Sequence, residues 1–118
     1  MTQEIMGRGN DRKLAIMVAI SLIPHPTEKN LTEAVGIPKR SVHSTFKLLR
    51  DMNVVIDRVK GRRHGYYLIA DSGCFNLNRV HEVIQEKHPV IYNSIKSYAI
   101  EKDRSTPVAG TNMISNFG

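Results

Sequence analysis

Apolar residues recur at helical spacing in the first part of the chain. Asn10 or Asp11 could cap a helix, and the segment from Asp11 to Ile23 consists of strong helix formers whose apolar side chains occupy more than one face. We therefore expect a helix that is buried on several sides and ends at Pro24. A short second helix should follow, with Thr27 or Asn30 as its N-cap. Its inward-facing residues are expected to be Leu31, Ala34 and Val35.

A glycine and a proline mark the boundary between this helix and the next. Gly36 stands where the second helix stops, a position that favours a backbone with positive φ. Pro38 fits the first turn of a third helix over 38–52, because its missing N–H would be unpaired there anyway. The apolar face of this helix repeats at i, i+4 and i+7, in Val42, Phe46 and Leu49. Two helices joined by so short a turn form a helix-turn-helix.

A β-hairpin is predicted directly after the third helix. Asn53 is a suitable left-handed stop for the helix, and VVIDRV (54–59) and GYYLIA (65–70) are both rich in strand-forming residues. The segment KGRRHG between them supplies a glycine-hinged, cationic tip. A helix-turn-helix followed at once by a hairpin with a basic tip is the winged-helix arrangement.

Six apolar or aromatic residues follow the hairpin with spacings of 3, 4, 7, 4 and 3, which resembles a heptad seam. They are Leu77, Val80, Ile84, Ile91, Ile95 and Tyr98. We expect a helix over about 76–87, a break, and a second helix with Pro89 in its first turn. The seam predicts dimerisation through these helices, and the alternative is that they cover the domain's own core.

The predicted fold is therefore mainly α with a small antiparallel β hairpin, a three-helix core plus wing. We expect a flexible N-terminal arm over 1–10 and a winged helix-turn-helix DNA-binding domain over 11–71. A C-terminal helical dimerisation segment should cover 72–104, and a polar, aperiodic tail over 105–118 is expected to be disordered.

The charge of the chain is concentrated in Gly36–Gly65. This stretch holds eight basic and two acidic residues, and its surplus of six equals the net charge of the whole chain, +6. A basic patch on a helix and a hairpin is typical of a surface that binds a polyanion. Two alternatives to a polyanion-binding surface stay open. The polar helix face and loop could simply be solvated, or they could dock an acidic protein.

The polar face of the third helix and the hairpin tip supply the candidate binding residues. In the helix, which fits the major groove of duplex DNA, these are Lys39, Arg40, Ser41, His43, Ser44 and Lys47. In the hairpin, where contacts to phosphates would add affinity with little sequence choice, they are Arg58, Lys60, Arg62, Arg63 and His64.

The stretch Gly36-Ile37-Pro38-Lys39-Arg40-Ser41-Val42-His43, the segment 49–54 and the run Gly65-Tyr66-Tyr67-Leu68 carry a family resemblance. They resemble the N-terminal DNA-binding domain of IclR-type repressors among the bacterial winged-helix transcription regulators, over roughly 11–70. The chain departs from that pattern at Thr32, where alanine is usual, at Ser44, where arginine is frequent, and at Asn53, where glycine is frequent. In size it is more similar to MarR-, ArsR- or PadR-type regulators.

Other chemistry has little support in the sequence. The five histidines lack metal-ligand spacing, there is no phosphate-binding glycine loop, and no nucleophile has a recognisable base, so we expect no metal, cofactor or enzymatic activity. The lone cysteine, Cys74, is expected to be a small buried residue in a reducing compartment, and no segment is long and apolar enough for a membrane span. A cytoplasmic protein is the default expectation.

The sequence thus predicts a dimeric, sequence-specific regulator that binds double-stranded DNA, acting as a transcriptional repressor. A replication, partition or transfer protein of a plasmid or phage would share all of these features, and stays open as an alternative.

Overall fold

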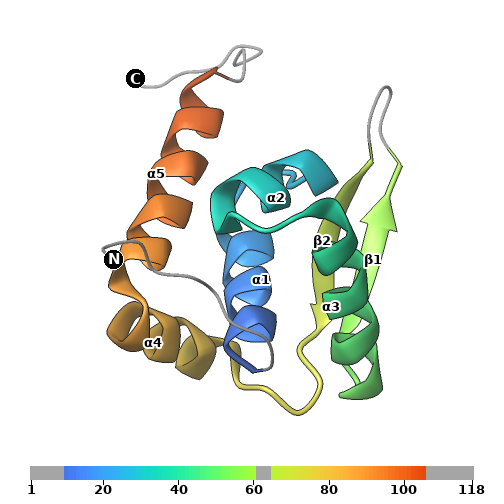
Figure 1. The fold of residues 1–118 in the computed structure, drawn as a ribbon. Helices are drawn as coiled ribbons and strands as arrows, with labels where there is room; N and C mark the ends of the chain where they lie inside the picture. Colours follow the sequence, from blue (N-terminus) through green and yellow to red (C-terminus); the bar gives the residue numbers. More distant parts are fainter. Residues whose placement is uncertain (1–9, 61–64, 106–118) are drawn as a thin grey trace, which may run out of the picture.

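The structure is a computed structural model and describes residues 10–60 and 65–105. Within these ranges the predicted mainly helical fold with one two-stranded antiparallel hairpin is confirmed (Figure 1). The elements are α1 (Asn10–Leu22), α2 (Glu28–Val35), α3 (Lys39–Asp51), β1 (Val55–Val59), β2 (Tyr66–Asp71), α4 (Leu77–Lys87) and α5 (Pro89–Ser105).

Helix α1 lies at the centre of the molecule. It packs against the four other helices and against β2, with α4 and α5 on one side and α3 and the hairpin on the other (Figure 1). The five side chains from Ala15 to Ala19 are completely buried, as the apolar residues on more than one face predicted. Burial of a side chain such as Ile16 or Met17 stabilises the fold by about 1.5–3 kcal/mol.

Helix α2 is capped at both ends, and its C-cap lies in the turn to α3. Thr27 and Asn30, the two candidate caps, form a capping box together: the Thr27 hydroxyl accepts from the Asn30 N–H at 3.2 Å, and the Asn30 side chain accepts from the Thr27 N–H at 2.9 Å. Gly36 has φ of +79°, as predicted. Pro38 is the N-cap of α3, one residue before the expected first turn, because its ψ of 159° is extended and the helix begins at Lys39.

The hairpin is tied to the helical core by one strand face and one backbone bond. Asn53 ends the helix segment with φ of +67°, the predicted left-handed stop. In the register, Val59 lies opposite Tyr66, and a bulge follows Val55. The Tyr67 N–H donates to the carbonyl of Pro26 at 2.9 Å, which attaches β2 to the connection before α2. The hairpin residues that pack, partly buried, on the core are Ile56, Tyr67 and Ile69.

The connection after β2 is pressed against the turn that follows α3. Gly73 has φ of +63°, and a Cβ built there would lie 2.5 Å from the Met52 carbonyl oxygen, so a side chain has no room. The next N–H, of Cys74, donates to the same carbonyl at 3.3 Å. Cys74 is exposed, which corrects the expectation of a buried residue: its thiol also reaches this surface carbonyl, at 3.3 Å, instead of entering the core.

The C-terminal seam packs inside a single protomer. Helices α4 and α5 both contact α1, and the seam residues fill the space between the three helices. Val80, Ile84, Ile91 and Ile95 are buried in the core, and Leu77 and Tyr98 pack against it half-buried. Four of the six seam residues are thus enclosed by their own chain, which is the packing expected if the helices cover the domain's own core. Dimerisation through these helices stays a prediction.

A histidine at the contact between α1 and α4 has a lowered pKa. The Ser21 hydroxyl donates to the Val18 carbonyl at 2.9 Å, so its oxygen is free to accept from His81 Nε2 at 2.8 Å. Burial lowers the pKa of His81 below its usual 6.5, because the charged ring loses hydration.

A buried isoleucine and an exposed leucine provide a matched test of the core. Replacement of the fully buried Ile95 by Ala should lower the free energy of unfolding by about 2–5 kcal/mol, since it leaves a cavity. Replacement of Leu48 in α3, which is 46% exposed, by Ala should change it by no more than about 0.5 kcal/mol. Urea unfolding followed by circular dichroism measures both, and equal losses would contradict the packing described here.

Protonation of His81 should destabilise the protein in mild acid. Because its folded pKa lies below that of the unfolded chain, the unfolded state binds more protons as pH falls below about 6.5, and stability is lost there and regained above it. Replacement of His81 by Gln should flatten the change in thermal midpoint between pH 7 and pH 5. An unchanged pH profile in this variant would contradict the assignment.

Candidate nucleic-acid interface

Helix α3 presents a polar, basic face to solvent. Its opposite face carries the predicted apolar residues Val42, Phe46 and Leu49, all buried in the core. Because these residues and Thr45 are buried on one side of the helix, the opposite side faces solvent. The exposed polar residues that line a shallow hollow along this side of the helix, together with Phe46, are Arg40, His43, Ser44, Lys47 and Arg50. Leu48 and Asp51 of α3 are also exposed.

The two serines of the predicted set differ from the basic residues in their bonding. Ser41 is half-buried, and its carbonyl accepts from the Ser44 hydroxyl at 3.1 Å. This local bond uses the only proton of the Ser44 hydroxyl, so its oxygen is left as an acceptor. Arg40 and Lys47 retain several donors each, and both are exposed.

The hairpin adds cations beside α3. Arg58 and Lys60 are exposed near the end of β1. The other predicted hairpin residues, Arg62, Arg63 and His64, lie outside the described residues. Arg58 lies opposite Tyr67 in the strand register, so its backbone is fixed by the ladder.

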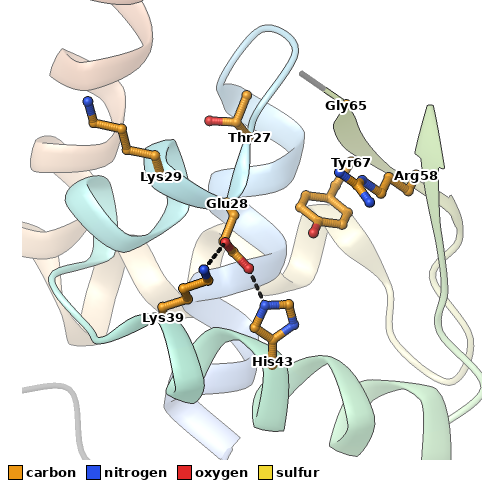
Figure 2. A pocket seen from close by; sticks show the side chains of 8 residues that line it. All are labelled: Thr27, Glu28, Lys29, Lys39, His43, Arg58, Gly65 and Tyr67. Atoms are coloured by element: carbon orange, nitrogen blue, oxygen red, sulfur yellow. Dashed lines mark hydrogen bonds and ion pairs between the residues drawn. The ribbon is translucent and has the colours of Figure 1, made fainter. Parts of the chain in front are cut away.

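A cavity of about 530 Å³ lies between the start of α2, the start of α3 and the hairpin (Figure 2). Predicted residues of the helix and of the hairpin both line it. Its lining residues are Thr27, Glu28, Lys29, Lys39, His43, Arg58, Gly65 and Tyr67.

One carboxylate stands among the cations of this cavity. Glu28, the first residue of α2, has one oxygen 3.4 Å from the Lys39 ammonium nitrogen, and its other oxygen is hydrogen-bonded to Nε2 of His43. Figure 2 shows both contacts reaching across from α2 to α3. The Glu28 side chain is 27% exposed, against 72% for Lys39 and 53% for His43. Glu28 thus connects the two helices at their solvent face.

Aromatic rings set the spacing between α3 and the hairpin. Phe46 of α3 and Tyr67 of β2 meet edge to face with centroids 4.9 Å apart. The His43 ring also meets Phe46 edge to face, with ring centroids 6.2 Å apart. Such edge contacts fix relative orientation as well as burying area. Helix α3 and the hairpin are therefore held together by packed rings.

A polar cluster ties α5 to the start of α2. The Tyr98 hydroxyl donates to Glu33 at 2.5 Å and accepts from the Asn30 amide at 2.9 Å, while the Lys102 ammonium donates to Asn30 at 2.7 Å. Burial, with the Glu33 bond, raises the pKa of Tyr98, and burial lowers the pKa of Lys102. Because Asn30 also belongs to the capping box with Thr27, the C-terminal helix helps to hold the end of α2 that carries Glu28.

Several residues of this surface were not predicted from the sequence as site residues, among them Glu28, Arg50 and Tyr67. Arg50 could have been found, because it follows Lys47 by three residues on the same helix face. An acidic residue in the first turn of a helix is commonly a partner of the helix dipole, so nothing in the pattern assigns Glu28 to α3. Its role depends on how the two helices cross, which the turn geometry decides.

Comparison of the chain with family models, curated proteins and solved structures finds no match. Within residues 10–60 and 65–105, no group of three or more histidine, cysteine or acidic side chains could hold a metal ion. No helix in the same ranges is long and apolar enough to cross a membrane.

Proposed function

We propose that the protein is a winged-helix regulator that binds double-stranded DNA with sequence specificity. The observation that carries the proposal is the exposed basic face of α3, which is continuous with the cations of the hairpin. Both lie on the side of α1 away from α4 and α5 (Figure 1). A single basic surface formed by a helix and a hairpin suits a duplex, whose grooves and phosphates run side by side.

The dimensions and chemistry of α3 suit the major groove. The helix is 13 residues long, and its outward face consists mainly of polar side chains. A major groove about 12 Å wide admits such a helix, where Arg40 and Lys47 would donate to guanine O6 and N7. The Ser44 hydroxyl keeps an acceptor oxygen, which would accept from an exocyclic amino group.

The hairpin would bind the phosphate backbone. Arg58 and Lys60 carry their charges at its end, where side chains reach beyond the strands. Charges on a hairpin tip neutralise phosphates without reading bases, so they would raise affinity for all sequences alike. The sequence adds Arg62, Arg63 and His64 to the same loop.

A homodimer would use apolar residues of α5 that its own chain leaves exposed, because four of the six seam residues are buried. Ile100 is 54% exposed, and Val90, at the start of the helix, is 60% exposed. A shallow hollow with an apolar floor lies next to Ile100, lined by Leu22, Pro24, Lys96, Ala99, Ile100 and Asp103. A two-fold dimer through this face would match a two-fold operator. Repression of transcription is the role we propose, and control of plasmid or phage replication, partition or transfer is the related alternative.

Two pairs of substitutions separate a DNA-binding surface from general positive charge. Replacement of both Arg40 and Lys47 by Ala should weaken binding to a duplex selected from a random pool. Each side chain that contacts a base should contribute about 1–3 kcal/mol to this loss of binding free energy. Replacement of Arg79 and Lys87 by Ala removes the same charge from exposed positions of α4 and should leave affinity nearly unchanged. Fluorescence anisotropy measures both.

The salt dependence of the wild-type protein tests the same proposal. If each protomer of a dimer neutralises about four phosphates, log K should fall with log salt at a slope near −7. Absence of duplex binding at low salt, or equal losses in the two double variants, would contradict the proposal. If the double variant of Arg40 and Lys47 kept its DNA affinity but no longer bound a protein partner, a module that docks an acidic protein would replace the DNA-binding proposal.

A further inference from the structure

Glu28 is an acidic group on a surface that otherwise attracts a polyanion. A carboxylate in this position would repel phosphates, so its presence calls for a role that outweighs the lost attraction. Its two partners are Lys39 and His43, both in the predicted binding set, and it reaches them from a different helix (Figure 2). The capping box of Thr27 fixes the backbone from which the carboxylate extends.

We propose that Glu28 is a specificity-determining residue that selects, through His43, an amino-bearing base over a keto-bearing base. The proposal rests on the proposed function, in which α3 enters the major groove. Glu28 touches no base in this account: it is a positioning residue, and His43 is the residue that reads.

The chemistry follows from the bond between the two side chains. A carboxylate can only accept, so the Nε2 atom of His43 must carry the proton that it shares with Glu28. In the neutral ring Nδ1 is then an acceptor. Glu28 therefore fixes both the tautomer of His43 and the direction of its ring.

An acceptor in the major groove discriminates between bases. Adenine N6 and cytosine N4 carry amino groups that donate to it, whereas guanine and thymine present the acceptors O6, N7 and O4. Nδ1 of His43 would thus favour adenine or cytosine on the contacted strand. If the ring were protonated on both nitrogens, Nδ1 would donate instead, and the preference would change to guanine or thymine.

The Lys39 contact adds a second effect with a separate readout. While Glu28 engages the Lys39 ammonium, part of that charge is neutralised and contributes less to non-specific phosphate binding. Removal of the carboxylate should therefore tighten binding to unrelated duplexes while base preference at one position is lost. A residue with a purely structural role would change both kinds of binding in the same direction.

The test is a selection from a random duplex pool, read by sequencing, with wild-type protein and four variants. Wild type should favour adenine or cytosine over guanine or thymine by about tenfold at one position. Glu28→Gln keeps the size of the side chain but loses its charge, and its amide can donate or accept, so the preference there should fall to near equality. Affinity of Glu28→Gln for an unrelated duplex should rise several-fold at low salt.

The other variants show whether Glu28 acts through His43. His43→Ala should lose the base preference at the same position. The double variant of Glu28→Gln with His43→Ala should lose no further preference there, because the two residues act as one unit. Glu82→Gln removes the same charge from an exposed site on α4 and should keep the wild-type profile. Thermal midpoints establish that each variant is folded.

The outcomes distinguish this inference from the function on which it rests. If wild-type protein binds no duplex at all, the proposed function is overturned and the inference with it. If wild type binds selectively but Glu28→Gln keeps the full profile, or the position read by His43 favours guanine or thymine, the role of Glu28 is overturned and the function stands.

Discussion

Burial of α1 on every side is the constraint on which the rest of the structure depends. A helix with apolar residues on more than one face is stable in water only if other elements enclose it, and here four helices and β2 do so. The enclosure divides the surface in two: α4 and α5 lie on one side of α1, and α3 and the hairpin lie on the other (Figure 1). With its apolar face anchored on the core, α3 exposes its basic face.

Polar contacts connect these two sides at the start of α2. Tyr98 and Lys102 of α5 hold Asn30, which completes the capping box, and the adjacent Glu28 holds Lys39 and His43 of α3. The start of α2 therefore contacts both α5 and α3, the proposed DNA-binding helix. The placement of Lys39 and His43 depends on this junction as well as on the apolar core.

Local signals in the sequence were sufficient for most of the fold. The left-handed positions at Gly36 and Asn53, the capping pair and the strand pattern are each determined by neighbouring residues. Thr32, a departure from the resembled family, fits because its hydroxyl donates to the Lys29 carbonyl at 2.8 Å.

Features that depend on distant contacts were not predictable from the same signals. A seam with spacings of 3 and 4 suits a partner helix from any source, so the periodicity of Ile84 and Ile95 could not tell a dimer from the protomer's own core. Glu28 was missed because its partners lie on another helix, and the exposure of Cys74 depends on the close approach of Gly73 to the turn after α3.

The central claim is that α3 and the hairpin form one DNA-binding surface. Titration of ¹⁵N-labelled protein with a selected duplex, followed by amide chemical shifts, tests it most directly. The account predicts that the largest changes fall within residues 39–47 and at Arg58 and Lys60, while amides along α4 change little. Changes concentrated on α4 and the outward face of α5, with α3 unaffected, would contradict it.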